Sequence, residues 1–415
     1  MKRIVVIGGG ASGLCAALSA KEAGADVILL EHNDKLGKKL AATGNGRCNL
    51  GNAVLTADCY RGGNPQFVSD VFAECSPEQV RSWLTDRGLY LKEKRGYFYP
   101  YSEQAASVIT FFASRLADKG VNVIVSAEVL KLKKEKKGFS VTYKNLVSDK
   151  VVNVACDRVI VATGGMAGQN LGAGPFGYET AKSFGHVISP LFPALVQMVA
   201  RDKNLKTLSG VRAEAAVTLT TVLDGREEQH KEAGEVLFTD YGISGIAVMQ
   251  LSRYAGDAIR QKGEAALSID FLPDFSRDAL TDNISKRILS DFEMPVEDCL
   301  STILPKKLLY VIFLRAGVRA DAKNEKLTAK DIRNIVKEMK GFTLPIIQTK
   351  DFPMAQVTAG GISVFGIHAA TLESKLQKGL YFTGELLDVD GTCGGYNLQF
   401  AFATGILAGT AAATK

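Results

Sequence analysis

The sequence is poor in the residues that build disulfide-rich or metal-dependent proteins. Its 415 residues include only four histidines, and its seven cysteines are odd in number and scattered, without a CxxC pair. This usage argues against a disulfide framework, a zinc site and a dithiol redox centre. We therefore predict no metal site and expect a reducing, cytoplasmic location.

Long apolar runs and a large excess of one charge are also missing. No stretch approaches the roughly 20 apolar residues that a membrane span needs. The start, MKRIVVIGGGASGLCAAL, has the basic and apolar parts of a signal peptide. Its triple glycine and the lack of a small-residue cleavage site argue against that interpretation. The net charge of +6 is mild, so we predict neither a nucleic-acid partner nor a membrane partner.

The first thirty residues carry a complete dinucleotide-binding pattern. Arg3–Ile7 is a β-branched run typical of a buried parallel strand. Leu14–Ala23 predicts a helix, and Asp26–Leu30 predicts a second strand that ends at an acid, Glu31. A G-x-G-x-x-G motif alone is a weak signal, but here it lies between a strand and a helix. The motif predicts cofactor contacts at Gly8, Gly10, Ala11, Ser12 and Gly13.

These residue types suit a pyrophosphate and a ribose. The glycines let backbone approach the pyrophosphate at the helix N-terminus, where N–H groups and the helix dipole favour negative charge. Glu31 would accept hydrogen bonds from the adenosine ribose, and we expect His32 near the adenosine. A second motif match, residues 172–177, follows a polar loop and contains Pro175, so we interpret it as a turn before a helix.

FAD and NAD both fit this first unit, and the far end of the chain favours FAD. Gly379–Thr383 predicts a strand, and two glycines precede a long helix, Leu398–Ala413. A second helix N-terminus would stabilise the negative charge of a reduced flavin ring, and Glu385 is placed to bond the ribitol. A helix that merely covers the sheet is the alternative. The lead-in residues predicted to contact the cofactor are Gly395, Tyr396 and Asn397.

Two further segments fit the same cofactor. The stretch GKKLAATGNGRCNLGN (Gly37–Asn52) offers glycines that lie against a flat ring, polar side chains for ring or ribitol atoms, and basic side chains for phosphate. For each lysine a solvated surface charge is the alternative, and we interpret Cys48 as a packed residue rather than a redox thiol. The candidates here are Thr43, Gly44, Asn45, Asn49, Lys38, Lys39 and Arg47. The strand Asp157–Ala162 leads into a glycine junction that predicts contacts at Ala162, Thr163 and Gly164.

Four blocks of the sequence resemble the BaiN/RdsA-type NAD(P)/FAD-dependent oxidoreductases over essentially the full length. They are LGKKLAATGNGRCN (Leu36–Asn49), GEVLFTDYGISG (Gly234–Gly245), VTAGGIS (Val357–Ser363) and YFTGELLDVDGTCGGYNLQFAFATG (Tyr381–Gly405). By position the resemblance implies FAD contacts at Gly8, Gly10, Ser12, Gly13, Glu31, Lys39, Thr43, Asn45, Arg47, Cys48, Asn49, Val129, Thr163, Gly384, Glu385, Asn397 and Leu398.

The resemblance implies an α/β fold. It is a Rossmann-like FAD-binding domain of the glutathione-reductase type with an inserted β-rich and helical domain. We predict a discontinuous FAD domain (1–190 and 350–415), a β-rich insert (191–274) and a helical subdomain (275–349). Family members are linked to reduction of C=C bonds in keto bile acids and to oxidation of small amines. Because no second complete dinucleotide fingerprint is present, NAD(P)H would bind only transiently as electron donor.

The sequence thus predicts an FAD-dependent oxidoreductase that reduces an activated C=C bond of a small hydrophobic, steroid-like enone with NAD(P)H. The alternatives are a flavin-dependent oxidase of a small amine and a non-catalytic flavin-binding protein. No catalytic residue is assigned, because none of the four histidines lies in an acid/base constellation. Tyr241 and Arg95 are candidate groups on the substrate side. No signal for an oligomeric state is present.

Overall fold

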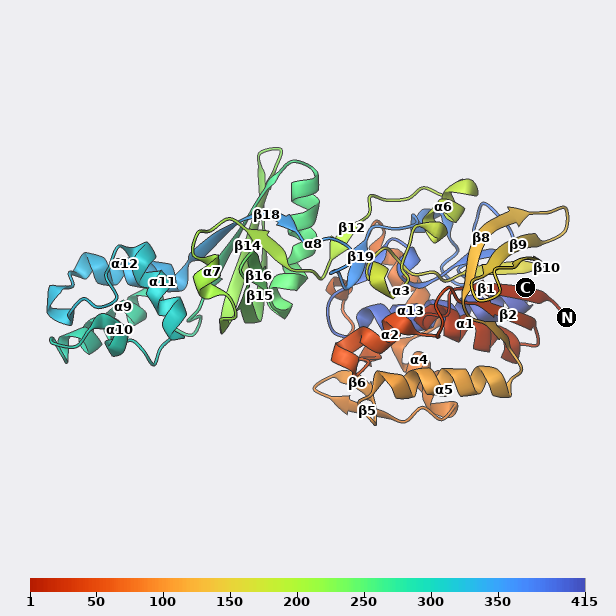
Figure 1. Cartoon of the computed structure of the whole chain (residues 1–415), viewed down its shortest axis with the longest axis horizontal. Coiled ribbons are helices and arrows are strands. Elements are labelled where there is room, and N and C mark those ends of the chain that lie inside the picture. Colours follow the sequence, from red (N-terminus) through yellow and green to blue (C-terminus); the bar gives the residue numbers. More distant parts are fainter. Residues whose placement is uncertain (415) are drawn as a thin grey trace. The chain divides into compact units, whose positions relative to one another are not determined.

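The computed structural model describes residues 1–414, apart from the side chain of Ala57. Contacts divide the chain into two compact units (Figure 1). The first comprises Met1–Phe192 and the residues from Val357 onward, and the second is Pro193–Gln356. The chain leaves the first unit within β12 (Phe192–Ala194) and returns to it just before β19 (Val357–Ala359). The assignment of the first unit as an FAD-binding domain remains a prediction.

The first unit is built on a parallel sheet with the N-terminal strand at its centre. The strand order is β20-β11-β1-β2-β7, and the neighbouring strands are parallel. Apart from Arg3 every residue of β1 is buried, as expected for an apolar run inside a parallel sheet. The predicted Rossmann-like arrangement is therefore confirmed. The strands are β20 (Leu380–Phe382), β11 (Arg158–Val161), β1 (Arg3–Ile7), β2 (Asp26–Leu30) and β7 (Asn122–Ile124).

Smaller antiparallel sheets and helices surround this sheet. The sheets are β10-β9-β8 (Val151–Cys156, Phe139–Asn145, Ala127–Lys134), β3-β6-β5 (Gly51–Asn52, Tyr97–Pro100, Leu91–Lys94) and β21-β4 (Val389–Gly391, Tyr60–Gly62). The helices are α1 (Ala11–Glu22), α2 (Lys38–Ala42), α3 (Pro65–Glu74), α4 (Pro77–Asp86), α5 (Ala105–Asp118), α6 (Phe176–Ser183) and α13 (Tyr396–Thr414). As predicted, a turn leads into a helix here, but Phe176 and Gly177, the last two residues of the second motif match, already belong to that helix, α6.

Helices from the two ends of the chain, α1 and α13, pack against each other (Figure 1). Glycines permit this approach. A methyl group on Gly405 would lie 2.2 Å from the backbone oxygen of Ser12, and one on Gly409 would lie 2.3 Å from that of Ala16. Both helices begin earlier than the sequence predicts, α1 by three residues and α13 by two, because motif residues form their first turns. The N-terminal half of α1 is thereby held against the middle and the C-terminal half of α13.

The second unit combines a closed barrel with a group of helices. The barrel order is β13-β16-β15-β14-β17-β18. Its strands are β13 (Met198–Ala200), β16 (Gly242–Ser244), β15 (Arg226–Phe238), β14 (Arg212–Leu223), β17 (Glu264–Asp270) and β18 (Phe342–Thr349). The helices are α7 (Leu205–Leu208), α8 (Ile246–Arg260), α9 (Arg277–Leu289), α10 (Val296–Cys299), α11 (Lys306–Ala316) and α12 (Ala329–Lys340).

One part of the second unit differs from the expected division of the insert. Residues 342–349, expected in the helical subdomain, form β18, which pairs with β13 and β17 and closes the barrel. Its first six residues alternate between buried and exposed, which is the pattern of a half-buried strand. The barrel strands therefore come from both sides of the helical segment, whose helices α9–α12 lie between Arg277 and Lys340.

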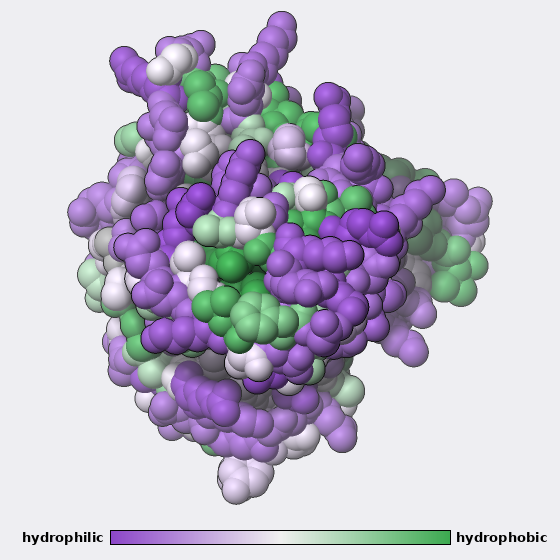
Figure 2. All heavy atoms as spheres, turned by 90° about the vertical axis from the view of Figure 1, so that its left-hand side faces the viewer, coloured by the Kyte–Doolittle hydropathy of each residue, from purple (hydrophilic) through white to green (hydrophobic). Residues whose placement is uncertain are grey.

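Large apolar side chains are exposed on the helical segment. Among them are Phe275, Leu289, Phe292, Tyr310 and Leu314, each more than 40% exposed. Figure 2, which faces this part of the chain, shows apolar residues in green surrounded by hydrophilic ones. Within residues 1–414, no helix is both long and apolar enough to cross a bilayer.

Candidate functional site

The N-terminus of α1 forms one end of the candidate site. A methyl group on Gly13 would lie 1.9 Å from the backbone oxygen of Gly8, so this glycine is needed for strand and helix to pack. Gly10 differs, because a methyl group there would meet no atom within 4 Å in the described part of the chain. No described side chain caps the helix at Gly10. The first-turn N–H groups therefore border open space that suits an anion.

Glu31 closes this end of the site. Glu31 is 7% exposed, and its carboxylate accepts a hydrogen bond from the backbone N–H of Gly9 (2.7 Å). It also accepts from the backbone N–H (2.7 Å) and side-chain amide (2.8 Å) of Asn33. Two carboxylate oxygens have about four acceptor positions in all, so Glu31 retains capacity for a ribose hydroxyl. Neighbouring His32 is exposed.

A third segment crosses the same end after β11. The Ala162 N–H donates to the Ile7 carbonyl (2.8 Å), and a methyl group on Gly8 would lie 2.4 Å from the Ala162 oxygen. The hydroxyl oxygen of the next residue, Thr163, is buried and has no hydrogen-bond partner among the described residues. This oxygen is covered by α6, because a methyl group on Gly177 would lie 2.3 Å from it. Gly164 follows with a positive φ of 73°.

The Gly-rich stretch near the N-terminus meets the turn before α13. A methyl group on Gly395 would lie 2.6 Å from the side-chain oxygen of Asn49. The Asn52 backbone N–H donates to the side chain of Gln399 (3.0 Å), and its side-chain amide donates to the Gly394 carbonyl (3.1 Å). The Gly-rich stretch and the turn before α13, more than 340 residues apart in sequence, thus form one wall of the candidate site.

An ion pair joins the same two regions. The amine of Lys39 lies 2.7 Å from one carboxylate oxygen of Glu385, and both side chains are at least two-thirds buried. The other oxygen accepts from the backbone N–H of Thr358 (2.8 Å), whose hydroxyl accepts from the N–H groups of Met166 (2.8 Å) and Ala167 (2.9 Å). Sequence reasoning missed Thr358 as a positioning residue, although the block VTAGGIS contains it.

In the loop between α2 and β3, backbone groups rather than side chains are the candidates for contact with a cofactor. Gly44, Asn45 and Gly46 have φ values of 57°, 53° and 80°, so the backbone turns through left-handed conformations. The Thr43 hydroxyl donates to Leu40 (2.7 Å), a local bond. The guanidinium of Arg47 lies 3.8 Å from Glu103 and is more than half exposed.

Several predicted side chains are occupied by local contacts. The Asn397 side chain accepts from the N–H of Gly391 and donates to its carbonyl, both at 2.8 Å. Tyr396 is buried, with its ring edge-on to Tyr60. These two residues can serve a cofactor through their backbone. Lys38 is exposed, and its amine donates to the side chain of Asn33 (3.3 Å).

The remaining candidates fall into two groups. Two candidates lie near the N-terminal glycine motif. The N–H of Gly384 donates to Thr404 (3.0 Å). Val129 is on β8, a strand whose first residue is hydrogen-bonded to Glu31. Leu398 is half-buried in the first turn of α13. Of the substrate-side candidates, Arg95 lies at the β5–β6 turn with a φ of 56°. Tyr241 belongs to the second unit, with the Lys350 amine 3.7 Å from its ring centre.

The first unit therefore fits a dinucleotide with two separately held ends. The open space at Gly10 and the buried Glu31 suit a pyrophosphate and its adenosine. The glycine turn before α13 suits a flat ring near a helix N-terminus. Contact between these residues and FAD stays a prediction.

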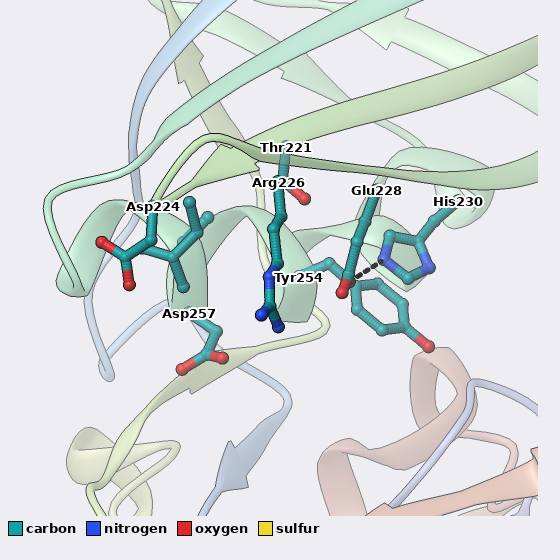
Figure 3. A pocket seen from close by; sticks show the side chains of 9 residues that line it. Thr221, Asp224, Arg226, Glu228, His230, Tyr254 and Asp257 are labelled. Atoms are coloured by element: carbon teal, nitrogen blue, oxygen red, sulfur yellow. Dashed lines mark ion pairs between the residues drawn. The ribbon is translucent and has the colours of Figure 1, made fainter.

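A separate surface hollow of about 460 Å³ lies on the second unit (Figure 3). A Glu228 carboxylate oxygen lies 3.7 Å from Nε2 of His230, and His230 stacks on Tyr254 at 3.5 Å between ring centres. Three carboxylates line the hollow and only one arginine does, so a phosphate would meet net negative charge. The hollow contains none of the predicted cofactor residues: it is lined by Thr221, Leu223, Asp224, Arg226, Glu228, His230, Tyr254, Asp257 and Ala258.

Buried thiols predict a loss of stability in alkali. Burial raises the pKa of Cys48 to about 12, although a hydrogen bond with Thr43 opposes the shift. An unfolded thiol ionises near pH ~8.5, so the folded chain holds this proton more tightly. The contribution is complete below pH ~8.5 and is lost as the pH rises towards about 12.

We expect the free energy of unfolding to fall between about pH 8.5 and pH 11, by up to ~1.4 kcal/mol per pH unit for each such thiol. Urea unfolding in reducing buffer measures this slope. In Cys48→Ala the free energy of unfolding should fall less steeply with pH, because one buried thiol fewer loses its proton on unfolding. If the variant and the parent showed the same slope, Cys48 would not make the predicted contribution.

Known proteins resemble this chain over nearly its whole length. A family described as HI0933-like protein Rossmann domain matches residues 2–411. A 3-dehydro-bile acid delta(4,6)-reductase of Clostridium scindens is 38% identical over 417 residues, which cover 100% of both chains. A ribosomal RNA dihydrouridine synthase of Haemophilus influenzae is 30% identical over 402 residues, and the alignment covers 96% of both chains.

Among solved structures, a 3-ketosteroid delta1-dehydrogenase of Sterolibacterium denitrificans aligns over 100% of both chains with a TM-score of 0.52. At 12% sequence identity this likeness concerns the fold alone. It extends to the whole chain, including the part inserted between the two segments of the first unit.

Proposed function

Since the chain belongs to the HI0933-like Rossmann-domain family, we propose that it uses FAD and NAD(P)H to saturate an activated C=C bond in a small hydrophobic, steroid-like enone. The chain is an enzyme, an oxidoreductase of the flavoprotein type. The observation that carries the substrate class is the 38% identity, over the full length, to a bile-acid reductase. Because its seven cysteines are odd in number and scattered without a CxxC pair, we place the protein in the cytoplasm.

In this proposal the two ends of the chain hold opposite ends of the cofactor. The first-turn N–H groups of α1 bind the pyrophosphate, and Glu31 accepts hydrogen bonds from the ribose. Glu385, fixed by Lys39, faces the ribitol, and the N-terminus of α13 lies at the ring edge. When bound, FAD supplies two-electron transfer between reductant and substrate.

The protein's own contribution is positioning and electrostatics. The positive end of the α13 dipole stabilises negative charge at the ring edge, and the Thr358–Glu385 bond keeps the carboxylate from turning away. NAD(P)H is proposed to bind transiently, because no strand among residues 1–414 directly precedes the second motif match, residues 172–177, and its Gly172 packs beside Asn33.

An anaerobic stopped-flow experiment tests the proposal. The purified protein is mixed with NADH or NADPH and followed at about 450 nm, and then with a 3-oxo-Δ4 steroid, a small amine or ribosomal RNA. We expect bleaching by NAD(P)H and recovery of colour with the steroid, whose mass rises by two hydrogens. Bleaching only by an amine, with peroxide formed in air, would establish an oxidase. Recovery with RNA alone would move the substrate class to that of the dihydrouridine synthases, and no bleaching would indicate a non-catalytic protein.

A further inference from the structure

The strand β6 presents two phenols on one face beside the candidate ring site. Tyr97 and Tyr99 alternate with Phe98, and side chains two residues apart on a strand share a face. Phe98 points to the other side, where the guanidinium of Arg81 lies 4.4 Å from its ring centre. The tyrosine face is therefore separate from the Phe98–Arg81 contact.

Tyr97 lies against the turn before α13, both directly and through Asn52. Asn52 is its cross-strand partner, and the Asn52 side chain donates to the Gly394 carbonyl (3.1 Å). A methyl group on Gly394 would lie 3.2 Å from the Cε1 atom of Tyr97. The phenol ring thus lies in contact with the glycine turn that is proposed to hold the flavin ring edge.

Exposure distinguishes Tyr97 from the other phenols and the thiol near this turn. Tyr97 is 37% exposed, whereas Tyr396 is buried and the Tyr60 hydroxyl is bonded to the Tyr396 carbonyl (2.9 Å). Tyr99 is half-buried, and burial raises its pKa, with Tyr97 adding to the shift and Arg47 opposing it. Burial also raises the pKa of the Cys393 thiol. Tyr97 is the phenol that can both reach a substrate and regain a proton from water.

We propose that Tyr97 is the catalytic acid of the enone reduction, an inference that rests on the proposed function. Saturating a C=C bond breaks its π bond and forms two C–H bonds. The electron pair and one hydrogen come from NAD(P)H, the reductant. The other hydrogen is a proton that the Tyr97 hydroxyl gives to the carbon next to the carbonyl, and the resulting phenolate takes a proton from water.

The test compares Tyr97→Phe with Tyr99→Phe, which removes a phenol from the same face of β6. Stopped-flow separates bleaching by NAD(P)H from recovery of colour with 4-androstene-3,17-dione. Binding of the steroid without reductant is measured from the change in flavin absorbance. For Tyr97→Phe we expect recovery to slow about 100-fold, with bleaching and steroid Kd within about threefold of the parent. Tyr99→Phe should stay within about fivefold in all three.

The outcomes separate the two proposals. A parent protein that is bleached by NAD(P)H but recovers with no enone refutes the proposed function, and the role of Tyr97 with it. A parent that recovers normally, with Tyr97→Phe recovering within about threefold of it, refutes the role of Tyr97 alone. Equal losses in the two variants, or a loss confined to steroid Kd, would also overturn the assignment, because either result indicates packing rather than proton transfer.

Discussion

Replacing Gly10 with alanine is expected to leave the apoprotein folded and to weaken FAD binding at least about 100-fold, or ~2.7 kcal/mol. The φ of Gly10 is −82°, a conformation that alanine adopts without strain, and its methyl group would meet no atom among residues 1–414 within 4 Å. In the complex the same methyl group would occupy the space proposed for the pyrophosphate. Fluorescence titration with FAD measures the affinity, and thermal unfolding of the apoprotein measures the fold.

Gly13→Ala is the matched comparison, because its methyl group would lie 1.9 Å from the Gly8 oxygen. This substitution should lower the stability of the apoprotein itself, by about 1–3 kcal/mol. Within one motif, Gly10 is therefore predicted to face the ligand, whereas Gly13 is needed for packing. An unchanged FAD affinity in the Gly10 variant would remove the pyrophosphate from the N-terminus of α1.

Gly405→Ala is expected to destabilise the protein by about 3 kcal/mol, the upper part of the usual overpacking range. Its methyl group would lie 2.2 Å from the Ser12 backbone oxygen and 3.0 Å from Cβ of Cys15, so α13 must move away from α1. Because both helix N-termini border the proposed cofactor, the affinity for FAD should fall as well. Urea unfolding and FAD titration measure the two effects.

Thr410→Ala provides the control on the same helix, since Thr410 is exposed. Its effect on the free energy of unfolding should stay within about 0.5 kcal/mol. Equal stability in the Gly405 and Thr410 variants would show that the close contact between α1 and α13 contributes nothing to the fold.

The opening β1–α1–β2 unit could be predicted in detail because its signals are local. The spacing of Gly8, Gly10 and Gly13, an apolar run on each side and Glu31 after the second run all lie within one short segment. The paired glycines before α13 likewise indicated a second helix N-terminus. The overall fold followed from these features and from the family resemblance, and the match to residues 2–411 confirms the family.

What escaped prediction depends on contacts that are distant in sequence. The Lys39–Glu385 pair spans 346 positions, and the role of Thr358 exists only where three segments meet. In the second unit, β15 begins with exposed charged residues that lack the apolar alternation of a buried strand. The segment 342–349 is separated from its barrel partners by the helices α9–α12, so its pairing was not readable from its neighbours.

The central claim is that Gly10 near one end of the chain and Glu385 near the other hold a single molecule of FAD. Titration of the purified apoprotein with FAD, followed by flavin fluorescence, tests it most directly. The account predicts saturation at about one FAD per chain, and marked weakening by Gly10→Ala and by Glu385→Ala. A protein that is colourless on purification and takes up no FAD on titration would contradict it, as would an affinity that neither substitution changes.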